Sequence, residues 1–246
     1  MNVACSPISI IIPAFNEESY IGPTLDSLRR ATEYLGDRDG LDIEIIVVDN
    51  GSMDRTAEVA RSRGANVVEE SRGNVAFARN AGARVAKGQF LVFVDADTHW
   101  PKSVLCRIVD VMSDDRCIGG AVATDYRPDR FVVRAYLRFW RVVGNLLQMA
   151  QGATQFCQAD TFSALGGYDE TIFMGEDVEF YWRLRKAART KGCCVKLIDD
   201  VRVVPSCRRF DKWPFWKTLI LTNPLTCMLF SRRKKPWGEW YGSPTR

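Results

Sequence analysis

The sequence lacks the features that mark membrane-spanning, secreted and nucleic-acid-binding proteins. No hydrophobic run approaches the ~20 residues that cross a bilayer. A strand-like pattern begins by Ile8 with no charged and apolar stretch before it, so we expect no secretory signal. The formal net charge of +4 is too small to indicate nucleic-acid binding, and no nucleic-acid partner is expected.

Cysteine spacing gives no sign of a zinc site or of a disulfide framework. The eight cysteines include no C-x-x-C pair, and two of them, Cys193 and Cys194, are adjacent. Because disulfides persist mainly in oxidising compartments, we expect reduced thiols and a cytoplasmic protein.

Two common nucleotide-binding signatures are also absent. No G-x-G-x-x-G segment follows a strand-like run, which counts against a dinucleotide-binding dehydrogenase, and there is no phosphate-loop signature. The 246 residues contain no linker-like tract. We therefore expect a single domain over 1–246.

The chain does contain a regular alternation of short apolar runs and helical patterns. The runs predict strands, and the periodic segments predict helices. The predicted strands are 8–12, 43–48, 67–68 and 90–94, and the predicted helices are 18–34, 54–63 and 75–86. Pro101 is expected to open a further helix as a first-turn proline. This order predicts an α/β fold with a mainly parallel central sheet flanked by helices.

The pattern changes beyond Gly120. A helix with interleaved aromatic and basic residues is predicted at 131–149, followed by a polar strand at 154–158. Another helix is predicted at 175–188. From Trp213 onwards the sequence mixes aromatic, proline and basic residues.

Acidic side chains follow three of the predicted strands. The loops are PAFNEE at 13–18, DNGS at 49–52 and DAD at 95–97. In open α/β sheets, ligands bind beyond the carboxyl ends of the strands. We therefore expect the three loops to converge on one edge of the sheet and to form a ligand site there.

Asp95 and Asp97 suit a divalent cation. Mg²⁺ and Mn²⁺ prefer oxygen ligands, and such a cation would bridge diphosphate oxygens. A D-x-D segment in a loop is also a common solvated turn, although its position after a buried strand favours the metal site. The single histidine, His99, could contact the metal, but a surface position is the favoured interpretation.

Two other acidic segments carry alternative interpretations. Asp49 could accept hydrogen bonds from a base or ribose, or its segment could be a β-turn with Ser52 or Asp54 as a helix cap. Glu176 and Asp177 suit a helix start, where negative charge is stabilised, and also suit a base that takes a proton from a hydroxyl. Burial beside Glu176 is expected to raise a carboxyl pKa in support of the second role.

In order along the chain, these segments resemble the family 2 glycosyltransferases, which are inverting enzymes of the GT-A fold. The resemblance covers roughly residues 7–210. It rests on IIPAFNEE (11–18), VVDNGS (47–52), ARNAG (78–82), FVDAD (93–97), FSALGGYDE (162–170) and GEDVEF (175–180). It implies transfer from a nucleotide sugar, with uracil the expected base and guanine also occurring in the family. A nucleotide-sugar-binding half would cover about 1–120. An acceptor-binding half with a helical and basic extension would cover about 121–246.

The resemblance also implies a role for each matched position. Asp177 would be the general base, Glu176 would position the acceptor or donor sugar, and Asp97 would bind the Mn²⁺ or Mg²⁺ cofactor. Asp95 would hold the ribose or sugar, and Asp49 would bond the base or ribose. The other expected nucleotide-sugar contacts are Pro13, Ala14, Phe15, Glu17, Arg72 and Ala96.

One departure from the family pattern concerns the metal. Many relatives supply a histidine after the catalytic helix, whereas the matching region here is VVPSCRR at 203–209. Arg208 or Arg209 could instead contact the diphosphate, because arginine forks suit phosphate oxygens. A solvated basic pair is equally consistent with the sequence.

Other functions remain open at this point. A nucleotidyltransferase would carry a glycine-rich basic loop after the first strand, and a non-catalytic homologue would bind nucleotide sugar without turnover. The acceptor could be lipid-linked, a glycan or a small molecule. The helix at 131–149 and the tail at 213–240 could lie on the inner face of a membrane, or could form a lid or a dimer interface.

Overall fold

An eight-stranded sheet forms the centre of the protein. The structure is a computed structural model that describes residues 7–36, 41–146 and 152–233. The strands lie in the order β3-β2-β1-β4-β7-β6-β8-β5. They are β1 (Ile8–Ala14), β2 (Ile43–Asp49), β3 (Asn66–Glu69), β4 (Phe90–Val94), β5 (Thr98–His99), β6 (Cys117–Thr124), β7 (Thr154–Gln158) and β8 (Cys194–Pro205). The helices are α1 (Glu18–Leu35), α2 (Thr56–Ser62), α3 (Val75–Val85), α4 (Val104–Met112), α5 (Phe131–Leu146), α6 (Ala159–Ala164), α7 (Glu176–Lys191), α8 (Arg208–Lys212), α9 (Phe215–Leu221) and α10 (Pro224–Phe230).

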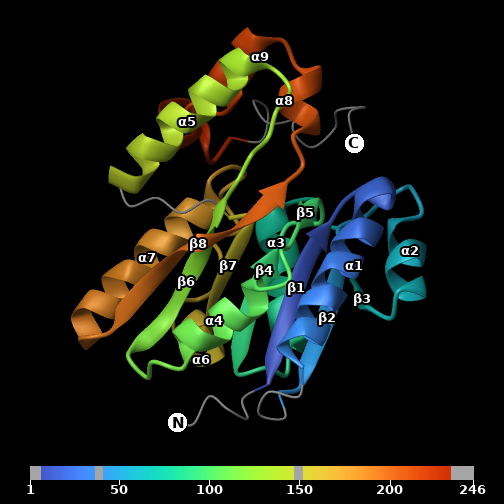
Figure 1. Ribbon diagram of the computed structural model, residues 1–246, viewed down its shortest axis with the longest axis vertical. Coiled ribbons are helices and arrows are strands. Elements are labelled where there is room, and N and C mark those ends of the chain that lie inside the picture. The colour runs from blue at the N-terminus through green and yellow to red at the C-terminus, as the bar shows by residue number, and fades with distance from the viewer. Residues whose placement is uncertain (1–6, 37–40, 147–151, 234–246) are drawn as a thin grey trace.

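Helices cover both faces of this sheet (Figure 1). The central strand β1 is buried over its whole length and pairs in parallel with β2 and with β4. Because successive strand side chains point to opposite faces, Ile10 and Ile12 pack in one core cluster with α1 and α4, whereas Ile11 packs in another with α3 and α7. The predicted α/β fold with a mainly parallel, helix-flanked sheet is confirmed.

The sheet is not wholly parallel, and one of its antiparallel strands, β7, matters for the site. β7 runs antiparallel to both β4 and β6, whereas β8 runs parallel to β6. The start of β7, rather than its end, therefore lies at the carboxyl edge of β1 and β4. There the main-chain N–H of Asp95 donates to the carbonyl of Ala153 at 3.2 Å. The segment before β7 thus reaches the acidic loop that follows β4.

A glycine lets α3 lie close against the sheet. A Cβ at Gly82 would lie 2.4 Å from Cγ2 of Ile11 and 3.0 Å from Cγ2 of Val48. The helix runs back from the carboxyl edge of the parallel strands, so its first turns lie at that edge. Arg79, one turn before Gly82, is thereby brought beside the acidic loops.

Several boundaries expected from the sequence can be compared with the structure. The helix expected to start at Pro101 starts instead at Val104, because Pro101 lies in the preceding turn and its carbonyl accepts the N–H of Val104 at 3.1 Å. The helix predicted at 131–149 is α5, and 147–149 lie outside the described residues, as do 234–240 of the tail. The seven cysteines within the described ranges are free thiols.

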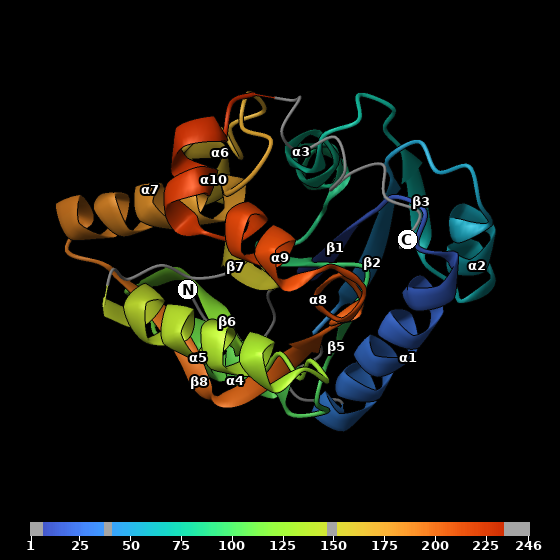
Figure 2. The ribbon, with the colours of Figure 1, turned by 90° about the horizontal axis from the view of Figure 1, so that it is seen from above.

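A layer of helices covers the carboxyl edge of the sheet. Figure 1 shows α5, α8 and α9 together on this side of the molecule, and Figure 2 shows α10 beside α9. The hydroxyl of Thr222 donates to that of Tyr136 at 3.2 Å, and the rings of Tyr136 and Phe215 are 6.2 Å apart, which joins α5 to α9. Within the described ranges, no helix is both long enough and apolar enough to cross a membrane.

Candidate active site

A cavity of about 780 Å³ lies between the carboxyl edge of the sheet and the helix layer. Most of the site residues predicted from the sequence line it. They are Pro13, Ala14, Phe15, Glu17, Asp95, Ala96, Asp97, Glu176, Asp177 and Arg209. Within the described part of the chain, Asp49, Arg72 and Arg208 are not among the lining residues.

Asp49 takes part in a turn beside the cavity. Its Oδ1 accepts the N–H of Ser52 at 3.0 Å, as expected for the β-turn interpretation of this segment. The carboxylate of Asp54 accepts the N–H of Thr56, the first residue of α2, at 3.0 Å, but the residue at the N-cap position is Arg55, and the helix begins two residues later than predicted. A contact between Asp49 and a base or ribose therefore stays a prediction.

Arg72 is held on the surface near the start of α3. Its Nε donates to Oε1 of Glu70 at 2.8 Å, and its guanidinium lies 4.2 Å from the centre of the Phe77 ring. Hydrogen bonding to Arg72 lowers the pKa of Glu70 to about 2. The predicted contact of Arg72 with the nucleotide sugar gains no support from this position.

The buried side chain of Arg79 joins two acidic segments of the site. Its Nη1 lies 2.5 Å from Oε1 of Glu176, and its Nη2 lies 2.9 Å from Oδ1 of Asp95. Burial raises the pKa of Asp95 to about 6 and that of Glu176 to about 7, and the charge of Arg79 opposes both shifts. Burial also disfavours the charge of Arg79, but the two carboxylates keep its pKa above the ordinary value. At the start of α7, burial thus raises the pKa of the Glu176 carboxyl.

Arg208 joins the loop after β1 to the loop after β4. Its Nη1 donates to Oε2 of Glu17 at 2.7 Å, and its Nη2 contacts Oε1 of the same carboxylate. Nη2 also lies 3.3 Å from Oδ2 of Asp97. Arg208 and Glu17 are both buried, so the expectation of a solvated basic pair is wrong for Arg208. The neighbouring Arg209 lines the cavity, where burial lowers its pKa and Asp97 opposes that effect.

Asp177, the second residue of α7, faces the segment that precedes β7. Its Oδ2 accepts the N–H of Gly152 at 2.5 Å, and its main-chain carbonyl accepts from Nε2 of Gln155 at 3.0 Å. A Cβ at Gly152 would lie 2.5 Å from Cβ of Asp177, so this close approach requires glycine. Gly175 begins the helix from a left-handed conformation with φ of 84°. The contact with Gly152 therefore holds the carboxylate of Asp177, and the contact with Gln155 holds its main chain.

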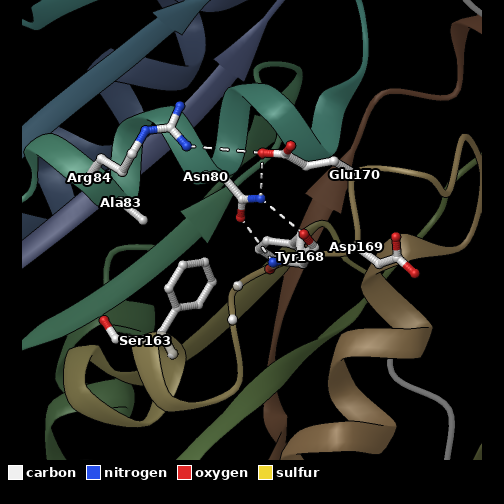
Figure 3. A pocket seen from close by; sticks show the side chains of 10 residues that line it. Asn80, Ala83, Arg84, Ser163, Tyr168, Asp169 and Glu170 are labelled. Atoms are coloured by element: carbon white, nitrogen blue, oxygen red, sulfur yellow. Dashed lines mark hydrogen bonds and ion pairs between the residues drawn. The ribbon is translucent and has the colours of Figure 1, made fainter.

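Asn80 of α3 and Asn74, which caps the start of that helix, hold the loop that leads into α7. Nδ2 of Asn80 donates to the carbonyl of Tyr168 at 2.9 Å and to Oε1 of Glu170 at 3.0 Å, and Oδ1 accepts the N–H of Tyr168 at 2.9 Å (Figure 3). Nδ2 of Asn74 donates to the carbonyls of Glu170 and Ile172, both at 3.0 Å. These bonds fix the position of the loop and therefore the position of the start of α7.

His99 lies away from the carboxylates of the cavity. Its Nε2 is 3.3 Å from Nη2 of Arg30, and the side chain is exposed on β5. Burial and the charge of Arg30 both lower its pKa. The surface interpretation of this histidine is confirmed.

The residues of the cavity suit a hard divalent cation that the protein and a bound diphosphate would hold jointly, rather than one enclosed by protein ligands alone. Among the described residues, no three histidine, cysteine or acidic side chains are grouped so that they could hold a metal ion. Asp97 lines the cavity and offers carboxylate oxygens, the donor type that Mn²⁺ and Mg²⁺ prefer. A cation at Asp97 would take its remaining ligands from diphosphate and water, as Mg²⁺ often does.

Two residues at the centre of the site, Arg79 and Tyr126, have no role predicted from the sequence. Arg79 had a visible signal, because it is a charged residue among Ala76, Ala78 and Gly82 on a helix that packs against the sheet. Tyr126 follows β6 in a segment with no distinctive pattern. Burial and three nearby aspartates, Asp95 first among them, raise the pKa of the Tyr126 hydroxyl, so it lines the cavity as a neutral group.

Comparisons with known proteins agree with this architecture. The family model described as "Glycosyl transferase family 2" matches residues 9–166. The chain is 34% identical to the "Uncharacterized glycosyltransferase EpsJ" of Bacillus subtilis over 108 residues. The aligned region is 42% of this chain and 29% of that relative. The chain spans less than half the length of the first curated relatives that it matches.

Solved structures show the same fold. Mannosyltransferase PcManGT from Pyrobaculum calidifontis, in complex with GDP-Man and Mn²⁺, matches with a TM-score of 0.66 at 21% identity, over 92% of this chain and 64% of that chain. Glucosyl-3-phosphoglycerate synthase from Mycobacterium tuberculosis, in complex with Mn²⁺, UDP and glucosyl-3-phosphoglycerate, matches with a TM-score of 0.60 at 21% identity, over 92% of this chain and 80% of that chain. The fold is therefore GT-A. The family model covers more than half of the sequence, and the chain belongs to glycosyl transferase family 2.

Proposed function

We propose that the protein is an inverting glycosyltransferase that moves a sugar from a nucleoside-diphosphate sugar to an acceptor hydroxyl, with UDP the expected nucleotide. One observation carries the proposal: Asp95, Asp97 and Asp177 line a single cavity together with the loop after β1. This cavity lies at the sheet edge where α/β proteins bind nucleotides. Membership of the glycosyl transferase family supports the same reaction class.

On the donor side, the diphosphate is proposed to lie between Asp97 and Arg209, which both line the cavity. Phe15, in the loop after β1, would contact the base. Mn²⁺ or Mg²⁺ held at Asp97 would, when bound, neutralise the charge that develops on the departing diphosphate. Arg208 orients Asp97 and places a fixed positive charge beside it, because its Nη2 lies 3.3 Å from Oδ2 of that carboxylate.

On the acceptor side, Asp177 is proposed to take the proton of the acceptor hydroxyl. The oxygen of that hydroxyl then bonds to the anomeric carbon while the bond from this carbon to the diphosphate oxygen breaks. The nucleoside diphosphate leaves from the opposite face, so the anomeric configuration inverts. Gly152 fixes Oδ2 of Asp177, which leaves Oδ1 to meet the acceptor. Glu176 is a poor candidate for this role, because its carboxylate lies 2.5 Å from Arg79.

A donor panel tests the proposal. UDP-sugars and GDP-sugars would be incubated with the protein and candidate acceptors, with Mn²⁺ or with EDTA, and release of nucleoside diphosphate would be measured. Both bases belong in the panel, because the structural neighbours were solved with GDP-Man and with UDP. We expect release from one donor, and we expect EDTA to weaken nucleotide affinity by about tenfold or more, which is about 1.4 kcal/mol.

Matched variants make the result specific. Asp97→Asn should weaken nucleotide binding in the presence of Mn²⁺, whereas Asp110→Asn on the exposed face of α4 should leave it unchanged. Formation of a nucleotide sugar from nucleoside triphosphate and sugar phosphate would instead establish a nucleotidyltransferase. Donor binding without turnover by any acceptor tested would favour a non-catalytic homologue.

A further inference from the structure

The helix α5 carries apolar side chains both toward the cavity and on its exposed surface. Tyr136 and Trp140 line the cavity. Val132, Phe139 and Val142 are exposed at the spacing of a single helical stripe. A helix on the surface of a globular protein normally presents a polar face to water. The exposed apolar stripe of α5 therefore indicates a surface that contacts a partner.

The outer surface of α9 and α10 has the same character. Trp216 and Ile220 lie one turn apart on α9 and are 63% and 50% exposed, and Leu229 on α10 is 75% exposed. Of the thirteen large hydrophobic side chains exposed in the described residues, eight lie on α5, α9 and α10. Single exposed hydrophobic residues are normal, but this concentration on three helices that lie together is not (Figure 2). We refer to these three helices as the cap.

All the charged side chains of the cap are basic. Its three helices contain Arg134, Arg138, Arg141 and Lys217 and no aspartate or glutamate. Arg134 and Arg138 are exposed beside the apolar stripe of α5. Aromatic and aliphatic side chains interleaved with arginine on an outer helix face suit an anionic lipid surface, which attracts the basic residues.

We propose that the cap docks the protein on an anionic lipid surface. A second copy of this chain fits the same face less well, because a two-fold dimer would bring the exposed Arg134 and Arg138 of both copies together, and the three helices of the cap carry no acidic residue to oppose them. The inner face of the cap lines the cavity through Tyr136 and Arg141. Docking would therefore hold the cavity close to the lipid head groups.

Vesicle sedimentation tests the docking directly. The full chain would be mixed with vesicles of phosphatidylcholine alone or of phosphatidylcholine with phosphatidylglycerol, and the bound fraction would be measured at low and high salt. We expect binding to the anionic vesicles that falls as salt rises. Phe139→Ser combined with Trp216→Ser should weaken binding by about tenfold or more, because two exposed aromatic side chains no longer enter the lipid.

Matched variants separate docking from other effects. Tyr34→Ser on α1 removes an equally exposed aromatic side chain outside the cap and should bind as the wild type does. Asp177→Asn should also bind normally, so docking can be judged independently of catalysis. The proposal is wrong if the wild type does not sediment with anionic vesicles, or if Phe139→Ser/Trp216→Ser binds them equally well. It is also wrong if the wild type is a dimer that this double variant converts to a monomer without any lipid binding.

Discussion

Arg79 and Asp95 form an ion pair at the base of the cavity, with 2.9 Å between Nη2 and Oδ1. The same guanidinium lies 2.5 Å from Oε1 of Glu176. One arginine on α3 therefore joins the acidic loop after β4 to the first residue of α7. Its two partners are near in sequence to the proposed metal ligand, Asp97, and next to the proposed base, Asp177, so Arg79 holds the segments that carry them in one arrangement.

Removing Arg79 should destabilise the protein strongly. Arg79→Met leaves the buried carboxyl of Glu176 and the acidic group of Asp95 without their shared cation, which should cost about 3–5 kcal/mol in the free energy of unfolding. Urea denaturation measures this value. Arg61→Met, which removes an arginine whose ion pair with Glu69 is exposed, serves as the control and should change little. Equal and small effects of both variants would mean that the buried network contributes no stability.

The Asn80 side chain should matter for stability and for turnover. Asn80→Ala leaves the buried N–H and C=O of Tyr168 without the partners they have now, and each unsatisfied group costs about 1–3 kcal/mol. Because the loop leads to α7, we expect kcat to fall while affinity for nucleotide is kept. Asn66→Ala, at an exposed strand end, should change neither quantity. A stable Asn80→Ala protein with wild-type kcat would contradict this view of the loop.

Glu176 should make the stability of the protein depend on pH. Burial raises its pKa from 4.5 to about 7, so the folded protein binds this proton more tightly than the unfolded chain does. Stability from this group is therefore complete below about pH 4.5 and is lost as pH rises through about 7. Unfolding free energies at pH 5 and pH 8 should show a decrease in the wild type that is smaller in Glu176→Gln. A parallel change in both proteins would show that Glu176 titrates with an ordinary pKa.

Gly152 should be required for the position of Asp177. In Gly152→Ala the new Cβ would lie 2.5 Å from Cβ of Asp177, so the carboxylate must move. Misplacement by about 1 Å can lower a rate by about 10²-fold, and we expect a loss in kcat of that order with nucleotide affinity unchanged. Gly22→Ala is the control, because its Cβ would meet only the flexible end of Arg63. Wild-type kcat in Gly152→Ala would show that Asp177 need not hold this position.

Much of the fold follows from local patterns in the sequence. The β-branched run at 8–12 has to be buried on both faces, and this alone indicates a covered sheet with parallel neighbours. The acidic loops after β1 and β4 could be expected to meet, because carboxyl ends of parallel strands share an edge. Asp95 and Asp97 do line one cavity with the loop after β1.

The pairings that complete the site could not be predicted in this way. Arg208 contacts Glu17 across 191 positions of sequence, and Arg79 contacts Glu176 across 97. Spacing carries no information about such partners, so the sequence left Arg208 open between a diphosphate contact and a solvated basic residue, and left Arg79 without a role. The reversal of β7, which brings Gly152 to Asp177, also depends on strand order rather than on local pattern.

The role of Asp177 as general base is the central claim, and one comparison tests it most directly. The rate of nucleoside diphosphate release from the active donor, with acceptor present, would be measured for the wild type and for Asp177→Asn, together with nucleotide affinity. The asparagine can still accept the N–H of Gly152 but cannot take a proton. We predict a fall in rate of about 10²–10⁴-fold with unchanged nucleotide affinity. An Asp177→Asn protein that turns over at the wild-type rate would contradict the account.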